Sequence, residues 1–220
     1  MESEVRVETY AALAARVLAA PPRLGPVRLV AVDGFAGSGK TTFAARLGAA
    51  LEAQIVHTDD LLEGWAEPTS FWPRLEAWVL APLRAGQPGR YRRYDWLHEK
   101  FGARWREVPV AASLVIEGVS SARAAIRPEL TLSVWVAAPK AVRLERGIAR
   151  DGERLRPQWE AWQGAEESHV AVDHTPERTD LVVDGDPAVP HAPQHAFVTG
   201  RRTDQTQSYG LDVAPPESRT

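Results

Sequence analysis

The sequence predicts an α/β fold of three layers, in which a mostly parallel, five-stranded sheet lies between two layers of helices. Three observations support this prediction. Short apolar segments alternate with helical ones along the chain. The apolar run at residues 28–32 is continuous, as in a parallel strand that is covered on both faces. A glycine-rich segment follows this run directly and precedes a helical pattern.

The predicted strands are short apolar runs. In chain order they cover residues 28–32, 55–57, 113–116, 130–136 and 181–183. The predicted helices follow apolar positions at helical spacing. They cover residues 1–22 (the N-terminal helix), 40–52, 69–84, 121–126, 139–150 and 157–171. Residues 85–93 contain Gly, Pro and Arg without periodicity and are expected to form a loop. Alternating strands and helices imply right-handed crossovers between parallel strands.

The length of 220 residues fits one domain, which we place at residues 1–184. Residues 140–172 form its predicted helical lid region. Residues 185–220 contain repeated proline, small polar residues and few large apolar ones, so this segment is predicted to be a disordered C-terminal tail. His191 and His195 in this segment are interpreted as solvated side chains, because the sequence places no third metal ligand nearby.

The composition excludes several classes of function. Cysteine is absent, which excludes disulfides, thiolate metal sites and cysteine nucleophiles. The net charge of -3 gives no general reason to expect nucleic acid or an anionic membrane as a partner. The chain starts with an acidic segment rather than a basic leader, and no apolar run approaches the roughly 20 residues of a membrane span. We therefore expect a soluble, cytoplasmic protein that binds neither nucleic acid nor membrane, with the oligomeric state left open.

The glycine-rich segment matches the phosphate-binding pattern G-x-x-x-x-G-K-[ST], and it lies where that pattern must lie, between a buried strand and a helix. Its glycines allow the backbone N–H groups to approach phosphate oxygens, and the start of the following helix favours negative charge. Lys40 is expected to reach the β- and γ-phosphates of ATP, and the Thr41 hydroxyl to bind Mg²⁺. The predicted nucleotide-binding residues here are Gly34, Phe35, Ala36, Gly37, Ser38, Gly39, Lys40, Thr41 and Thr42.

The rest of the chain decides among classes of phosphate-loop protein. GTPases usually carry an Asn-Lys-x-Asp segment that reads the base, and the sequence has none. Large ATPases generally place an Asp-Glu pair after an apolar strand, whereas Glu117-Gly118 follows the run at residues 114–116. Both classes are therefore disfavoured, and a kinase that acts on a small molecule is favoured.

Five segments of the sequence resemble the uridine kinase family of phosphate-loop kinases. The matching segments are residues 32–41, 57–62, 94–96, 116–118 and 143–151. The resemblance extends over about residues 28–184 and implies an ATP- and Mg²⁺-dependent transfer of the γ-phosphate to a hydroxyl of a small acceptor such as a nucleoside. Two positions depart from the family pattern. Gly147 replaces a further Arg, and Leu61-Leu62 replaces an aromatic pair.

The resemblance assigns catalytic roles to four side chains. It gives Asp59 the role of the carboxylate that orients or deprotonates the acceptor hydroxyl, and Asp60 is its rival because adjacent residues at a strand end point in opposite directions. Glu117 and Asp59 join Thr41 as predicted Mg²⁺ ligands, Glu117 through water. Arg146 and Arg150 lie on one helical face of the lid region, where Arg146 is expected to bind nucleotide and Arg150 to assist catalysis.

The acceptor site is expected near the segment at residues 94–96. Here Tyr94 would stack on the acceptor, and Arg93, His98 and Asp60 would supply polar contacts. Among the tryptophans, Trp65 is the one that we expect in this pocket.

Two alternatives stay open. A nucleoside monophosphate kinase would need extra arginines, which Arg90, Arg92 and Arg93 could supply. A regulatory module would bind nucleotide without transferring phosphate.

Overall fold

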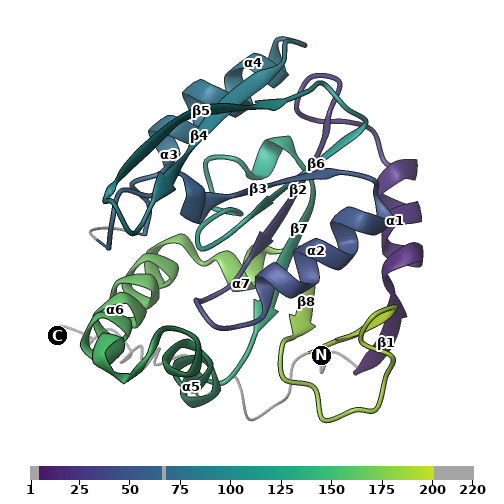
Figure 1. Cartoon of the computed structure of the whole chain (residues 1–220). Coiled ribbons are helices and arrows are strands. Elements are labelled where there is room, and N and C mark those ends of the chain that lie inside the picture. The colour runs from purple at the N-terminus through teal and green to yellow at the C-terminus, as the bar shows by residue number, and fades with distance from the viewer. Residues whose placement is uncertain (1–4, 66–67, 201–220) are drawn as a thin grey trace, which may run out of the picture.

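The computed structural model describes residues 5–65 and 68–200 (Figure 1). A seven-stranded sheet forms the middle layer, in the order β1-β9-β8-β7-β2-β6-β3. Its strands are β1 (Arg6–Thr9), β2 (Arg28–Asp33), β3 (Gln54–His57), β6 (Ser113–Glu117), β7 (Leu130–Ala137), β8 (Leu181–Asp184) and β9 (Ala196–Thr199). The five strands from β8 to β3 are parallel to one another and correspond to the five predicted strands. The predicted α/β fold class is therefore confirmed, while the strand count was too low.

The two additional strands lie at one edge of the sheet and are antiparallel. β9 pairs with β8, and β1 pairs with β9. The sequence pattern concealed β1 because it runs directly into a helix, which starts at Tyr10 and not at residue 1; the Thr9 hydroxyl caps this helix by accepting a hydrogen bond from Ala12 N at 3.1 Å. The predicted disordered tail is likewise corrected for residues 185–199, since they include β9. Residues 201–220 lie outside the described residues.

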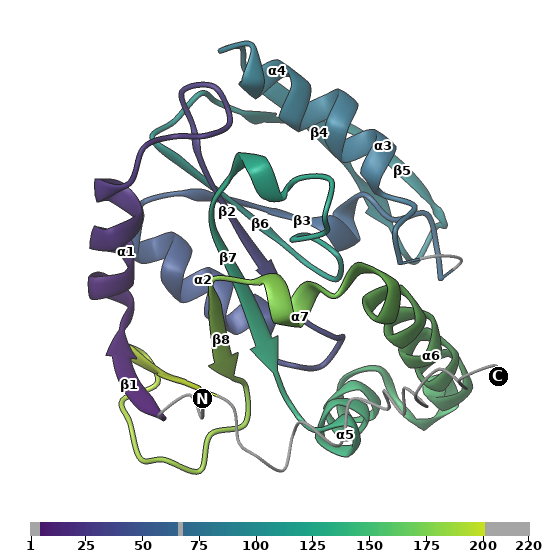
Figure 2. The same cartoon turned by 180° about the vertical axis from the view of Figure 1, so that it is seen from behind.

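Helices cover both faces of the sheet (Figures 1 and 2). The helices of more than one turn are α1 (Tyr10–Ala19), α2 (Lys40–Ala50), α5 (Lys140–Asp151) and α6 (Arg156–Asp173). A continuous helical segment is built from α3 (Trp72–Leu75), the π-helical turn η2 (Glu76–Leu80) and α4 (Ala81–Arg84). Shorter pieces are η1 (Thr58–Asp60), η3 (Arg127–Glu129), η4 (Glu153–Leu155) and α7 (Thr175–Arg178). No helix of the described residues is long and apolar enough to span a membrane.

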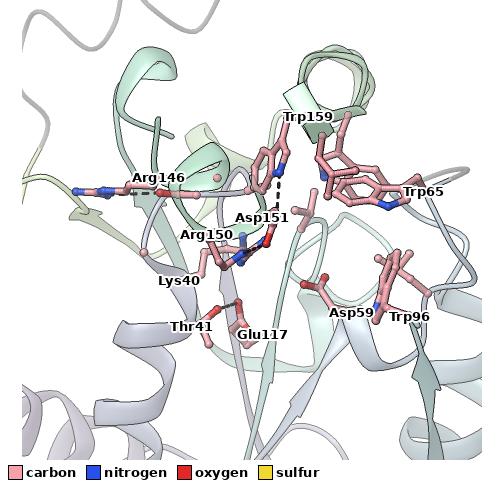
Figure 3. Close-up of a pocket in the computed structure, with 18 of the residues that line it drawn as sticks. Lys40, Thr41, Asp59, Trp65, Trp96, Glu117, Arg146, Arg150, Asp151 and Trp159 are labelled. Atoms are coloured by element: carbon pink, nitrogen blue, oxygen red, sulfur yellow. Dashed lines mark hydrogen bonds and ion pairs between the residues drawn. The ribbon is translucent and has the colours of Figure 1, made fainter. Parts of the chain in front are cut away.

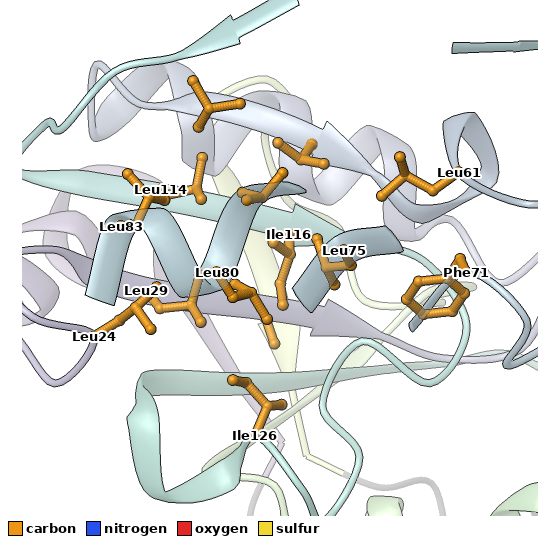
Figure 4. Packing of buried hydrophobic residues seen from close by; sticks show 14 of the residues in the cluster. Leu24, Leu29, Leu61, Phe71, Leu75, Leu80, Leu83, Leu114, Ile116 and Ile126 are labelled. Atoms are coloured by element: carbon orange, nitrogen blue, oxygen red, sulfur yellow. The ribbon is translucent and has the colours of Figure 1, made fainter. Parts of the chain in front are cut away.

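Alternate residues of β2 divide the core into two layers. Val30 and Val32 face α1 and α2, whereas Leu29 and Ala31 face the segment from α3 to α4 (Figure 4). This alternation follows from the two-residue period of a strand, and it explains why the strand is apolar throughout. The central strands are therefore fixed from both sides, and their carboxyl ends hold the loops of the site at defined positions.

Two predicted elements are wrong. The predicted loop at residues 85–93 instead contains the start of β4 (Gly89–Asp95), which pairs with β5 (Lys100–Val108) in a separate two-stranded sheet. Tyrosines spaced among arginines in β4 are the signal that was missed. Tyr91 and Tyr94 are both buried although they are three residues apart, because an irregularity between Arg92 and Tyr94 shifts the register of the strand. The predicted helix at residues 121–126 is a series of turns that leads into η3.

Candidate functional site

The phosphate loop joins β2 to α2 and lies against α5, in the predicted lid region. Gly37 has φ 79°, and a Cβ at this position would lie 2.4 Å from Arg143 O, so the close approach of the loop to α5 requires glycine. Gly39 has φ 101° and caps α2. The loop thus leads into the amino end of a helix of 11 residues, where backbone N–H groups and the helix dipole favour an anion.

A buried carboxylate fixes the base of the loop. Asp33 at the end of β2 accepts hydrogen bonds from Gly34 N at 2.7 Å, Ser120 N at 2.9 Å and Ala122 N at 2.9 Å. Burial raises the pKa of Asp33 to about 6, and these N–H groups and the positive charge of Lys40 oppose the rise. Asp33 therefore joins the phosphate loop to the loop that follows β6.

Lys40 lies at the start of α2 with 8% of its surface exposed. Its Nζ donates to Phe35 O across the loop at 3.1 Å. The ammonium group is therefore held within the loop, where phosphate oxygens would lie close to it.

Thr41, Glu117 and His57 form a polar chain across three elements. The Thr41 hydroxyl donates to Glu117 Oε1 at 3.2 Å, and His57 Nδ1 lies 2.7 Å from Glu117 Oε2. The hydrogen bond to Glu117 raises the pKa of His57, which favours the positively charged ring beside the carboxylate. Thr41 and Glu117 present hard oxygen ligands of the kind that Mg²⁺ prefers.

These oxygens fit a Mg²⁺ ion that is shared with phosphate. Among the described residues no group of three or more His, Cys, Asp and Glu side chains could hold a metal ion. Mg²⁺ commonly uses only one or two protein carboxylates and completes its shell with water and substrate phosphates. The residues present therefore fit such an ion, and Glu117, Thr41 and Asp59 would hold it.

The neighbouring acids Asp59 and Asp60 have different surroundings. The Asp59 side chain is exposed and lines the main cavity, which is described below. Two causes raise the pKa of Asp59: first the removal of water by the surrounding protein, and second the negative charge of Glu117. Asp60 is only 6% exposed, and its Oδ1 accepts a hydrogen bond from Arg93 Nε at 2.7 Å. Of the two, Asp59 is thus the one placed to meet a ligand, and Asp60 holds Arg93.

The main cavity has a volume of about 810 Å³ and lies at the carboxyl ends of the parallel strands (Figure 3). Its phosphate side is formed by Ala36, Gly37, Gly39, Lys40, Thr41, Thr42 and Glu117. The remaining lining residues are Asp59, Leu62, Trp65, Trp96, Val119, Arg146, Gly147, Arg150, Asp151, Leu155, Trp159 and Trp162. In Figure 3 Asp59 lies between the Thr41–Glu117 pair and Trp96. The structure therefore brings Lys40, Thr41, Asp59, Glu117 and Arg150 to one cavity.

The two lid arginines have different partners. Arg150 donates to both carboxylate oxygens of Asp151, at 2.8 and 2.9 Å, and its guanidinium lies 5.4 Å from the centre of the Trp159 ring. Arg146 donates to Gly185 O at 3.0 Å and to Asp186 Oδ1 at 2.7 Å. Arg150 therefore points into the main cavity, while Arg146 reaches the loop that follows β8 (Figure 3).

A second cavity of about 340 Å³ lies on the other side of Arg146. It shares Gly39, Thr42 and Arg146 with the main cavity, so the two meet at the start of α2. Part of its wall comes from residues 191–198, which the sequence had assigned to a disordered tail. This second cavity was not predicted.

Glu166 of α6 is a buried acid that sequence reasoning missed. Both of its oxygens accept a hydrogen bond from Ala36 N, at 3.0 and 3.1 Å, and Oε1 also accepts one from Trp162 Nε1. Burial raises the pKa of Glu166 to about 7, against the opposing charges of Lys40 and Arg143. Helix α6 thus contacts the phosphate loop through this carboxylate. In the sequence, the position of Glu166 four residues after Trp162 in an amphipathic helix was a weak signal for the contact between these two side chains.

The predicted acceptor residues lie outside the main cavity. Asp60, Arg93, Tyr94 and His98 are absent from its lining. Arg93 is paired with Asp60, His98 with Asp95 at 2.8 Å, and Tyr94 packs edge-on against Trp96 at 5.4 Å between ring centres. Tryptophans take the place of these residues in the cavity wall. Trp65 was predicted for the pocket, and Trp96 belongs to the segment at residues 94–96 near which the acceptor site was expected, whereas Trp159 and Trp162 were not predicted.

Comparisons with known proteins agree with this architecture. No protein-family model matches the chain, and no curated protein matches it. Among solved structures, a possible uridine kinase from Bacillus stearothermophilus has a TM-score of 0.57 and 20% sequence identity, with 79% of this chain and 96% of that chain covered. The fold is that of the phosphate-loop kinases. A Silicibacter protein provisionally described as a fructose transport system kinase also has a TM-score of 0.57, with 23% identity and coverage of 73% and 95%. At these identities the likeness establishes the fold.

Proposed function

We propose that the protein is an ATP- and Mg²⁺-dependent kinase that transfers the γ-phosphate to a hydroxyl group of a small molecule. The observation that carries this proposal is the convergence of Lys40, the Thr41–Glu117 pair and Asp59 on one cavity of about 810 Å³. Phosphoryl transfer needs charge neutralisation and an in-line nucleophile more than covalent catalysis, and these side chains supply both.

The nucleotide lies across both cavities in this proposal. Its phosphates contact the loop and the start of α2, and its base enters the second cavity beside Arg146, since Gly39 and Thr42 line both spaces. Thr41, Glu117 and Asp59 would hold Mg²⁺, which would supply charge neutralisation at the phosphates. Lys40 reaches the transferred group, and Arg150 stabilises the charge that develops on it.

Asp59 handles the acceptor hydroxyl. As the hydroxyl oxygen forms a bond to the γ-phosphorus, the bond from that phosphorus to the β-phosphate oxygen breaks, and ADP leaves with the electron pair. The hydroxyl proton passes to the Asp59 carboxylate. The exposure of the Asp59 side chain within the main cavity supports this role, because an acceptor hydroxyl can reach the carboxylate there.

The alternative of a nucleoside monophosphate kinase loses support. Arg90 and Arg92 lie over the Trp105 ring at 4.8 and 4.9 Å, and Arg93 is paired with Asp60. None of the three lines the main cavity, where an acceptor phosphate would need them.

The direct test is an acceptor screen. The full-length protein is incubated with Mg-ATP and a panel of small alcohols, nucleosides and sugars, and products are identified by mass spectrometry. A phosphorylated acceptor that forms together with ADP is the expected result. If only ADP and free phosphate form with every acceptor, or if nucleotide binds without turnover, the regulatory module is the better description.

A further inference from the structure

Four tryptophans form one wall of the main cavity, and we name Trp65, Trp96, Trp159 and Trp162 the tryptophan wall. The centre of the Trp65 ring lies 5.7 Å from that of Trp96, 6.3 Å from Trp159 and 5.5 Å from Trp162. The residues come from three separate parts of the chain: the loop after η1, the turn after β4, and α6. Their meeting at one cavity is a product of the fold and not of a local helical stripe.

The wall has a buried part and an open part. Trp159 and Trp162 are 2% and 7% exposed, whereas Trp65 and Trp96 are 39% and 40% exposed while lining the cavity. The indole N–H groups of Trp159 and Trp162 are already donated to Asp151 and Glu166. The open rings therefore offer apolar area, and the buried rings have no N–H group left for a ligand.

A glycine in the lid makes room for the wall. A Cβ at Gly147 would lie 2.6 Å from two atoms of the Trp159 ring, so Trp159 packs directly on the backbone of α5. A larger side chain at this position would therefore displace the indole ring.

We propose that the tryptophan wall binds the body of the acceptor, and that this acceptor is a neutral alcohol carried on an aromatic ring with few polar groups. The proposal rests on the kinase function proposed above, because the alcohol must reach Asp59, which lies beside Trp96 (Figure 3). An aromatic ring gains from edge and face contacts with the indoles in addition to apolar burial.

Two other kinds of acceptor body fit this wall less well. The hydroxyl or amide groups of a sugar or a nucleobase would find no hydrogen-bond partner in the apolar side chains of Leu62, Val119 and Leu155. A cationic body would meet Arg150, which already lies over the Trp159 ring at 5.4 Å. Such a body would have to compete for this ring with Arg150, which Asp151 already holds in place.

The test measures binding by calorimetry, with the full-length protein saturated with Mg²⁺ and a non-hydrolysable ATP analogue. The probes are 2-phenylethanol, choline, glycerol and uridine. We expect 2-phenylethanol to bind most tightly, and Trp65→Ala and Trp96→Ala each to weaken its binding by about tenfold, as for the loss of one stacking platform. Gly147→Ala should also weaken it, because the added methyl group displaces Trp159. Nucleotide affinity should stay at the parent value in Trp65→Ala and Trp96→Ala.

Trp105→Ala is the matched control. Trp105 is 39% exposed, like Trp65, but it lies on β5 outside the cavity lining. Tighter binding of glycerol, choline or uridine, or equal losses in Trp105→Ala and Trp65→Ala, would overturn the proposal. Thermal melting identifies a variant that does not fold, and the remaining two then decide. If 2-phenylethanol binds at the wall but is never phosphorylated from ATP, the proposed kinase function is contradicted and the proposed binding surface is not. If glycerol is phosphorylated instead, the aromatic acceptor is contradicted and the kinase function is not.

Discussion

The phosphate loop and the tryptophan wall face each other across one cavity, and they are built in different ways. The loop is a single stretch of chain whose backbone is fixed by glycines and by the buried acids Asp33 and Glu166. The wall is assembled from three distant segments and is held by ring packing. The loop is thus suited to one rigid chemical group, the phosphate chain, whereas the exposed members of the wall, Trp65 and Trp96, can be changed without altering the loop.

Asp59→Asn should have the largest effect, because it removes the proton acceptor that lies between the two regions. We expect turnover to fall by about 10²–10⁴-fold while ATP affinity stays near the parent value. Steady-state kinetics with the identified acceptor and nucleotide titration measure the two quantities. The matched control is Asp60→Asn, which should lower thermal stability through its contact with Arg93 and leave turnover close to normal. The reverse pattern would transfer the catalytic role to Asp60.

Lys40→Ala tests the phosphate side alone. Loss of the ammonium group should reduce turnover by about 10²–10³-fold, since it removes one charge that stabilises the transferred group. It should also weaken Mg-ATP binding and leave acceptor binding at the tryptophan wall unchanged. Lys100→Ala, on the exposed hairpin strand β5, is the control. Parent-like nucleotide binding by Lys40→Ala would remove the basis of the functional proposal.

Glu166→Gln probes the contact between helix α6 and the phosphate loop. The pKa of Glu166 is about 7 in the folded protein and 4.5 ordinarily, so the folded state binds the proton more tightly. Between pH 4.5 and about 7 the free energy of unfolding therefore falls as pH rises, by on the order of 3 kcal/mol for this group.

Thermal melts at pH 5 and pH 7.5 should accordingly differ less in Glu166→Gln than in the parent. The variant should still show a smaller fall in the free energy of unfolding as pH rises, because the pKa of Asp33 is raised to about 6. Glu167→Gln changes the neighbouring acid, which pairs with Lys140 at the surface, and should retain the parent profile. An unchanged pH profile in Glu166→Gln would show that this carboxylate is not the group that titrates.

Arg146→Ala should have the smallest effect. Arg146 forms an ion pair with Asp186, and each of the two side chains is 40% exposed. Loss of this pair should therefore change the free energy of unfolding by less than about 1 kcal/mol. If the nucleotide base enters the second cavity, the KM for ATP should rise several-fold with kcat almost unchanged. Arg156→Ala, which removes a similarly exposed pair with Glu153, controls for general loss of surface charge.

The contrast between the two regions also explains what could be predicted from the sequence. The five parallel strands and the phosphate loop depend on local patterns, such as the apolar run at residues 28–32 and the spacing of glycines before Lys40. The tryptophan wall depends on which segments meet in space. Trp96 lies in the segment at residues 94–96 where the acceptor site was expected, but no local pattern marks Trp159 or Trp162 as part of the wall. Tyr94 and His98 were expected in the pocket. Their type suited a ligand, but pairing between β4 and β5 placed them elsewhere.

The antiparallel edge strands have a consequence for the connectivity of the chain. Because Arg6 lies opposite Thr199, the first and last strands are neighbours in the sheet, roughly 5 Å apart. A short linker could join residue 199 to residue 6, and new termini could then be opened in an exposed turn such as that around Gly86. Such a circular permutant would keep every strand pairing of the sheet, with both of its new ends outside the lining of the two cavities.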